Sequence, residues 1–299
     1  MRFHRTRLPM TLASLGFAVL IGCGGGEGGG EGGGTPTPSP SEPSFEELVH
    51  LFDYDQEAPI DLHYVTTTTQ ADAEVHQVYY PSPKGGTVTA YLVVPLQDGP
   101  YAGVVFLHWN QGNRGEFLWE AVELARRGVA SLSLDAPWET PDPPAMTQDD
   151  MYIREVVDAR RAVDVLTSRP DVDVARLGYV GHSNGAIFGA VLAGVERRIR
   201  AYVLMTGYAR PSVYYPDNLA PSPRLDAIHY IGHAAPSALL FQFGTMDPNI
   251  SEAVAMEFYD AASEPKFIAW YDTGHGLNEQ ARVDRADWLA AQLALEPAR

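Results

Sequence analysis

Residues 177–190 read Leu-Gly-Tyr-Val-Gly-His-Ser-Asn-Gly-Ala-Ile-Phe-Gly-Ala, and this stretch decides the fold. Its first five residues are typical of a strand and its last five of a helix, and Gly181-His-Ser-Asn-Gly185 lies at the junction. Glycines on both sides of a serine allow a turn tight enough to expose the hydroxyl, and the amides that open the helix can bind an oxyanion. The stretch therefore predicts a strand, a sharp turn and a helix, with Ser183 as a candidate nucleophile.

The rest of the chain repeats the order of strand and then helix. β-Rich runs on both sides of Lys84-Gly-Gly86 predict an antiparallel pair, and the later apolar runs alternate with amphipathic segments, which predicts a mostly parallel sheet covered on both faces. The predicted strands are 75–80, 87–94, 103–109, 129–134, 176–181, 200–206, 238–243 and 266–270. The predicted helices are 116–127, 149–168, 184–194, 225–231, 251–262 and 279–295. Ligands of such sheets bind beyond the carboxyl ends of the strands, and we expect the proline- and tyrosine-rich segment 207–236 to cap that edge.

A serine hydroxyl is a weak nucleophile, so it needs a histidine to accept its proton and a carboxylate to orient that histidine. His275 follows a predicted strand and lies between two glycines, which suits a loop that presents a ring at close quarters. Asp247 follows the strand 238–243 through Gly-Thr-Met and is the favoured acid. The competing acids are Asp217 and Asp226, which lie in the cap segment, and Asp272, which is too near His275 in sequence.

Backbone amides are predicted to hold the oxyanion that forms when the nucleophile attacks. Asn184 opens the helix after Ser183, and a second donor should come from the loop after the strand that ends near His108, where Trp109 and Asn110 are the candidates. We expect the His108 and His182 side chains to hydrogen-bond loops.

Other polar and aromatic side chains are expected at the same end of the sheet. Four of the aromatic ones are predicted to line the substrate pocket: Trp138, Tyr208, Tyr214 and Tyr215. Arg114 is expected to be exposed rather than to bind a substrate carboxylate. His229 and His233 have the i, i+4 spacing of a metal pair, but no Glu follows His229 in the zincin pattern, so we predict neither a metal site nor a cofactor.

Together, these motifs resemble those of the α/β-hydrolase superfamily and, within it, of dienelactone-hydrolase-like and acetyl-esterase-like proteins. The resemblance extends from about residue 75 to 295 and includes Gly103-Val-Val-Phe-Leu-His, Gly181-His-Ser-Asn-Gly, Gly244-Thr-Met-Asp and Thr273-Gly-His-Gly. It implies an α/β fold with a mostly parallel eight-stranded sheet, no cofactor, and Ser183, Asp247 and His275 as a catalytic triad. Trp109 replaces the usual glycine of the oxyanion loop. Serine also stands where dienelactone hydrolases proper carry cysteine, which argues against that activity.

The N-terminal region has the features of an export signal. Residues 1–22 combine a basic start with an apolar stretch that is too short to span a bilayer, and Leu20-Ile-Gly-Cys23 resembles the lipobox of bacterial lipoproteins. Cys23, the only cysteine, is therefore the predicted lipidation site, followed by a Gly/Pro-rich linker over 23–44 and a hydrolase domain over 45–299. We expect an exported protein held at a membrane by its lipid.

These features favour a serine hydrolase that cleaves carboxylic esters through an acyl-enzyme, on a small-molecule or polymer-borne substrate. The alternatives are a peptidase or thioesterase on the same fold, or a non-catalytic lipoprotein that binds at the cell surface. The formal net charge of −17 repels a phosphate backbone, so we predict no nucleic-acid partner. The sequence gives no indication of the oligomeric state.

Overall fold

The computed structural model describes residues 43–140, 145–216 and 219–295. The predicted signal sequence, the lipidation site Cys23, nearly all of the predicted linker and the alternative acid Asp217 lie outside these residues. No helix in the described ranges is both long enough and apolar enough to cross a membrane.

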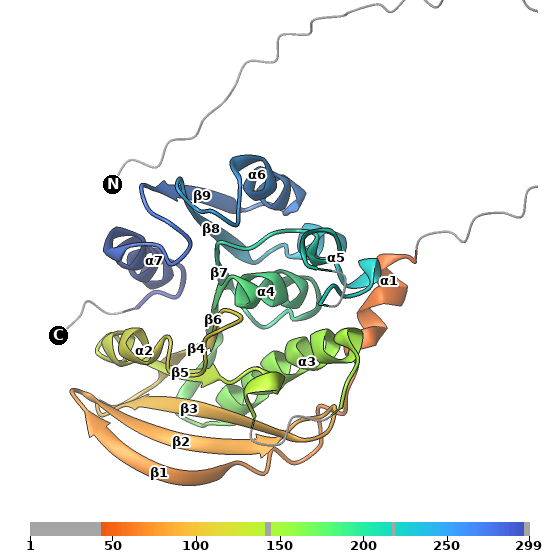
Figure 1. The fold of residues 1–299 in the computed structure, drawn as a ribbon. Helices are drawn as coiled ribbons and strands as arrows, with labels where there is room; N and C mark the ends of the chain where they lie inside the picture. Colours follow the sequence, from red (N-terminus) through yellow and green to blue (C-terminus); the bar gives the residue numbers. More distant parts are fainter. Residues whose placement is uncertain (1–42, 141–144, 217–218, 296–299) are drawn as a thin grey trace, which may run out of the picture. The chain divides into compact units, whose positions relative to one another are not determined.

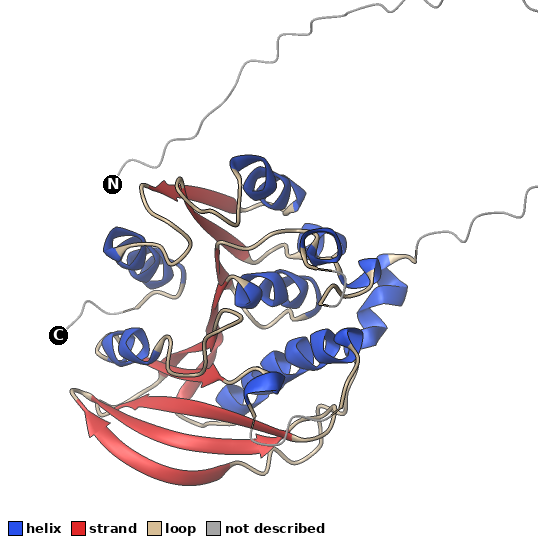
Figure 2. Ribbon diagram, viewed as in Figure 1, coloured by secondary structure: helices blue, strands red, loops and turns tan. Residues whose placement is uncertain are grey.

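A single twisted sheet forms the centre of the fold (Figures 1 and 2). Within the described residues it has nine strands: β1 (His63–Gln70), β2 (Ala73–Pro81), β3 (Thr87–Pro95), β4 (Tyr101–Leu107), β5 (Val129–Leu134), β6 (Val172–His182), β7 (Ala201–Met205), β8 (Ala238–Gly244) and β9 (Lys266–Tyr271). The spatial order is β1-β2-β3-β5-β4-β6-β7-β8-β9. β1, β2 and β3 are antiparallel to their neighbours, and the remaining six strands, β4 to β9, are parallel to one another. The predicted α/β architecture with a mostly parallel sheet is confirmed.

The predicted number of strands, eight, was one too few, because β1 was missed. Its sequence, His-Tyr-Val-Thr-Thr-Thr-Thr-Gln, pairs with β2 along the outer edge of the sheet, and every one of its residues is exposed. A strand without a buried face has no alternation of apolar and polar residues, so the usual signal of a strand is absent.

Helices cover both faces of the sheet, as Figure 1 shows. The helices are α1 (Phe45–Leu48), α2 (Leu118–Ala125), α3 (Gln148–Thr167), α4 (Asn184–Val195), α5 (Pro211–Tyr214), α6 (Glu252–Ala261) and α7 (Glu279–Gln292). α3, α4 and α6 contribute to the core on one face, and α2 and α7 contribute to the core on the other. Burial on both faces explains why the parallel strands are almost wholly apolar.

The predicted cap helix over 225–231 is not formed. The segment instead contains three short 3-10 turns, η3 (Pro223–Leu225), η4 (Ala227–His229) and η5 (Ile231–His233). The backbone of Asp226 is extended, with φ −61° and ψ 131°, and separates the first two turns. Its carboxylate accepts hydrogen bonds from the amide and hydroxyl of Ser212, so the side chain ties the segment to α5. Two further 3-10 turns, η1 (Val49–Phe52) and η2 (Pro137–Glu139), lie elsewhere.

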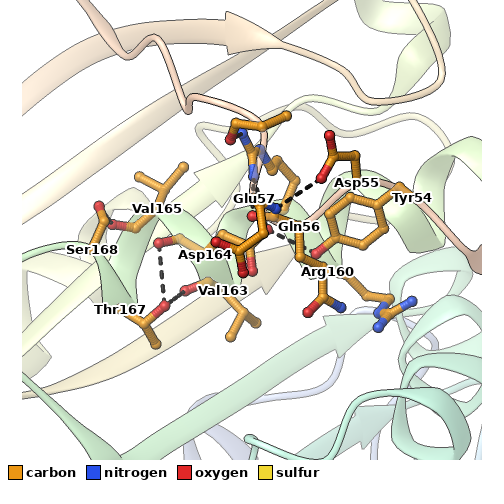
Figure 3. A network of polar contacts seen from close by, with 12 residues as sticks. Tyr54, Asp55, Gln56, Glu57, Arg160, Val163, Asp164, Val165, Thr167 and Ser168 are labelled. Atoms are coloured by element: carbon orange, nitrogen blue, oxygen red, sulfur yellow. Dashed lines mark hydrogen bonds and ion pairs between the residues drawn. The ribbon is translucent and has the colours of Figure 1, made fainter.

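Polar contacts fasten the segment before β1 to α3 (Figure 3). The Tyr54 hydroxyl donates to Asp164 at 2.8 Å, and the Arg160 guanidinium both packs 5.0 Å from the Tyr54 ring centre and donates to the Phe52 carbonyl at 2.8 Å. Burial, together with the Asp164 carboxylate, raises the pKa of Tyr54, so its hydroxyl remains a donor. This network anchors the start of the domain far from the carboxyl ends of the parallel strands.

Candidate active site

Ser183 occupies the sharp turn between β6 and α4. Its backbone has φ 53° and ψ −107°, a conformation that residues with a side chain rarely adopt and that must be held by its surroundings. A Cβ atom at Gly181 would lie 2.2 Å from the Gly185 carbonyl oxygen, and one at Gly185 would lie 2.1 Å from the Leu107 carbonyl oxygen. Both glycines of the pattern are therefore required by close backbone approach, and the strained turn sits at the carboxyl end of a central strand.

His275 and Asp247 come from the loops that follow β9 and β8. His275 Nδ1 donates to Asp247 Oδ2 at 2.8 Å, and the backbone amides of Asn249 and Ile250 donate to Asp247 Oδ1 at 2.8 and 3.2 Å. The Asp247 side chain is 0% exposed and that of His275 is 15% exposed. The structure thus brings the predicted acid and the predicted base into contact.

The charge of Asp247 fixes the proton on His275. Burial raises the pKa of Asp247, but the hydrogen bonds from His275 and the two amides outweigh it, so the pKa lies below its usual value of 3.8. The carboxylate is thus ionised near neutral pH and accepts the Nδ1 proton. His275 Nε2 then keeps a lone pair that can accept a proton from another group.

The loop that carries His275 is attached to the turn that carries Ser183. The His275 carbonyl accepts from His182 Nε2 at 3.1 Å and from the Thr206 hydroxyl at 3.3 Å, and His182 directly precedes Ser183. The hydroxyl of Ser183 has no hydrogen-bond partner among the residues that the structure describes. Such contacts are often long in a free enzyme, and the catalytic roles of the three residues stay predictions.

The competing acids do not contact His275. Asp226 binds Ser212, and Asp272 accepts from the Thr245 hydroxyl at 3.4 Å. Within the described ranges, the only carboxylate that contacts the His275 ring is that of Asp247.

The structure changes the expected set of oxyanion donors. The Trp109 amide donates to Glu116 Oε2 at 2.9 Å, so Trp109 is not free to bind an oxyanion and its prediction is corrected. Asn184 stands at the first position of α4, where an amide has no partner inside the helix. Asn110, the other candidate, lies in the exposed loop after β4 and accepts from Trp138 Nε1 at 3.3 Å through its carbonyl. Asn110 and Asn184 remain the candidate donors.

The predicted pocket residues separate into two groups. Tyr215 donates its hydroxyl to the Asn184 side chain, and Trp138 contacts Asn110, so these two rings adjoin the candidate oxyanion donors. Tyr208 is buried with its ring 5.5 Å from that of Tyr215, whereas Tyr214 is 43% exposed and donates to Glu257 at 3.0 Å.

Sequence reasoning missed two aromatic residues that lie beside these rings. The ring of Tyr152 lies 4.9 Å from Phe188 and 6.5 Å from Tyr215, and both Tyr152 and Phe188 are buried. They lie inside α3 and α4, where an aromatic side chain is indistinguishable in sequence from an ordinary core residue.

Two polar side chains near the site have structural partners. His108 Nε2 accepts from the Ala136 amide at 3.0 Å, and Nδ1 donates to the Trp109 carbonyl at 2.5 Å, in line with a loop-holding role. Arg114 was expected to be exposed, which is wrong. Its side chain is only 24% exposed, because it pairs with Asp135 at 3.1 Å and packs 4.9 Å from the Tyr91 ring centre.

His229 and His233 lie in separate 3-10 turns, and the His233 ring stacks on Phe45 at 3.6 Å. Across the part of the chain that the structure describes, no group of three or more His, Cys, Asp or Glu side chains is arranged to hold a metal ion.

Known proteins with this fold are carboxylic ester hydrolases among others. No protein-family model matches the chain. An uncharacterized protein present in two strains of Mycobacterium tuberculosis is 27% identical over 220 residues, which is 71% of each chain.

Among solved structures, an acetyl xylan esterase from a Paenibacillus species has a TM-score of 0.71 at 18% identity and covers 83% of this chain and 93% of its own. An acetyl xylan esterase from a Thermoanaerobacterium species has a TM-score of 0.70 at 15% identity with the same coverages. An S-formylglutathione hydrolase from Agrobacterium tumefaciens has a TM-score of 0.63 at 14% identity and covers 77% of this chain and 99% of its own. The chain therefore has the α/β-hydrolase fold.

Proposed function

We propose that the protein is a serine hydrolase that cleaves carboxylic esters. The proposal rests on the strained turn at Ser183 and on the contact between Asp247 and His275. The backbone carbonyl of His275 is hydrogen-bonded to His182, which directly precedes Ser183, so the pair is held beside the turn. The acetyl xylan esterases with the same fold support the reaction class.

In the first half of the reaction, His275 Nε2 accepts the Ser183 proton while Ser183 Oγ attacks the ester carbonyl. Asp247 stabilises the doubly protonated ring that results. The amides of Asn184 and Asn110 bind the oxyanion of the tetrahedral intermediate. His275 then gives its proton to the departing alcohol, which leaves an ester between the acyl group and Ser183.

The second half of the reaction restores the enzyme. A water molecule gives a proton to His275 Nε2 and attacks the acyl carbonyl, and the tetrahedral intermediate collapses with return of that proton to Ser183 Oγ. The net result is hydrolysis of one ester to one acid and one alcohol, with no external oxidant, reductant or metal.

Short acyl groups are the expected substrates, because aromatic rings crowd the space beside Asn184. The Tyr208 and Tyr215 ring centres lie 5.5 Å apart, and the Tyr152 ring lies 6.5 Å from that of Tyr215. We expect kcat/KM to fall by about tenfold or more between p-nitrophenyl acetate and the octanoate, since misfitting methylenes cost binding in a closed pocket. Acetylated polysaccharide should be included as a polymer-borne substrate.

Steady-state kinetics on p-nitrophenyl esters of increasing acyl length measure this preference. Tyr215→Ala is the comparison, because removal of the ring should reduce the difference in kcat/KM between the acetate and the octanoate. A rise of kcat/KM toward octanoate in the wild type would contradict a small pocket. Wild-type protein that neither turns over any ester nor reacts with a fluorophosphonate probe would refute the hydrolase itself. Thioesters and peptides of matched acyl group in the same series test the alternative activities.

We further propose that the enzyme works at a membrane surface, exported and lipidated at Cys23. The proposal is supported by the lipobox-like sequence and by the glycine- and proline-rich stretch behind it, which would let the domain reach away from the bilayer. Expression with an alkyne-tagged fatty acid should label the wild type and not Cys23→Ser, and the variant should leave the membrane fraction. Equal labelling of both proteins would contradict it.

A further inference from the structure

Glu116 lies at the point where three loops of the candidate site meet. One of its carboxylate oxygens accepts from the Trp109 amide at 2.9 Å, and the other lies 2.6 Å from His182 Nδ1. His182 Nε2 lies 3.1 Å from the His275 carbonyl oxygen. The contacts thus join the loop after β4 to the serine turn and then to the loop of the candidate base.

Both ring nitrogens of His182 have a hydrogen-bond partner. A carboxylate faces Nδ1 and a carbonyl oxygen faces Nε2, and both are acceptors. Each ring nitrogen therefore faces an acceptor, and a ring that carries both protons can donate to the two of them at once. The His182 side chain is 7% exposed and that of Glu116 20% exposed, so solvent has little access to the pair.

The surroundings support a positioning role rather than a chemical one. His182 and His275 have ring centres 5.3 Å apart, and the His182 ring stacks against Trp109 at 6.0 Å. Both nitrogens of His182 face acceptors, so neither is directed at the serine proton. The titratable groups that face it are Glu116 and His275, and Asp247 faces His275 from the other side.

We propose that Glu116 and His182 are positioning residues that hold the His275 loop against the Ser183 turn. The proposal rests on the proposed hydrolase function. Glu116 orients His182, and His182 fixes the backbone of His275 so that the Nε2 lone pair faces the nucleophile. The same carboxylate occupies the Trp109 amide, which leaves the oxyanion to Asn110 and Asn184.

Two substitutions at His182 separate the two contacts of its ring. In His182→Asn the amide nitrogen falls near the Nδ1 position, so the bond to Glu116 is kept and the bond to the His275 carbonyl is lost. In His182→Gln the amide nitrogen reaches near the Nε2 position, so the bond to the His275 carbonyl is kept and the bond to Glu116 is lost. We expect kcat to fall by about 10–100-fold in His182→Asn with KM changed by less than about threefold, because a misplaced base slows the chemical step more than it weakens binding. His182→Gln should retain at least about fivefold more kcat than His182→Asn.

Glu116→Gln and Glu116→Ala make a second matched pair. The glutamine oxygen can accept from the Trp109 amide while its amide group donates to Nδ1 of a neutral His182, whose Nε2 proton still reaches His275. Glu116→Ala removes the bonds to the Trp109 amide and to His182 Nδ1, so its kcat should be the lower of the two. His76→Asn on β2 removes a remote histidine–carboxylate contact, 3.3 Å from Glu74, and serves as the control for folding and activity.

Steady-state kinetics, thermal melting and nitrogen-15 NMR of labelled histidine test the proposal on the full chain. The NMR spectrum should show protons on both ring nitrogens of His182 in the wild type and on Nε2 alone in Glu116→Gln. Equal kcat losses in His182→Asn and His182→Gln, or a wild-type His182 with one protonated nitrogen, would overturn the positioning role. Wild-type protein without ester turnover would instead overturn the proposed function, and the NMR result would still report on the Glu116–His182 contact.

Discussion

Ser183→Ala should lower kcat for p-nitrophenyl acetate by about 10⁵–10⁶-fold, the loss typical when the nucleophile of a complete triad is removed. The substitution deletes only the hydroxyl. Alanine keeps the Cβ atom, and the turn at φ 53° is held by the close approach of Gly181 and Gly185 to neighbouring backbone, so the fold should persist. Steady-state kinetics and labelling with a fluorophosphonate measure the effect, and the label should disappear together with turnover.

Ser237→Ala is a suitable control, because its hydroxyl donates to the Ile199 carbonyl at 2.7 Å at the start of β8, the opposite end of the parallel strands from the site. It should keep wild-type kcat and labelling. Ser183→Ala protein that still forms the covalent adduct would place the nucleophile at another residue, and the proposed mechanism would have to be abandoned.

The sequence around Ser183 predicts the strand, the turn and the helix there, because each of these is determined by residues close together in the chain. β6 and α4 follow from strand-like and helix-like residues on either side of two glycines, and the clashes that a Cβ would make explain why both are glycine. A strand that is buried on both faces can be recognised in the sequence as a run of apolar residues. β1 does not, because none of its side chains is buried, and the cap segment follows turn chemistry around Asp226 rather than helical periodicity.

The candidate site divides in the same way. Asp247 and His275 could be chosen from chain order and from their places after strands, and their side chains meet at 2.8 Å. Glu116 could not be chosen, since it lies seven residues beyond Trp109 in the same loop and nothing in its sequence context indicates that it would cover the Trp109 amide. A contact of that kind depends on how the loop after β4 folds back on itself, which short-range patterns do not specify. Because this contact occupies the Trp109 amide, Trp109 cannot be the oxyanion donor that the sequence predicts.

Asp247→Asn should lower kcat by about 10⁴-fold while KM changes little, because the wrong ring nitrogen of His275 would carry the proton. The wild-type carboxylate can only accept, so it holds the proton on Nδ1 and leaves Nε2 free. The backbone amides of Asn249 and Ile250 still need an acceptor at this buried position, and the side-chain oxygen of the asparagine accepts from them. Its NH₂ group then faces Nδ1 and donates to it, which moves the ring proton to Nε2 and removes the lone pair that Ser183 needs.

The pH of the assay and a matched carboxylate make this prediction specific. Since the folded-state pKa of Asp247 lies below 3.8, the stabilisation that its hydrogen bonds provide is fully present above the unfolded-state pKa and is lost only as the pH falls through the folded value. Kinetics near pH 7 therefore compare a fully ionised carboxylate with an amide, and thermal melts at the same pH verify that the variant is folded. Asp272→Asn, three residues before His275 and bonded to Thr245 instead, should keep kcat within about threefold, as expected for an exposed carboxylate outside the triad. If the two variants lose activity equally, Asp247 does not orient the base, and the loss would have to come from a general disturbance of the loop after β9.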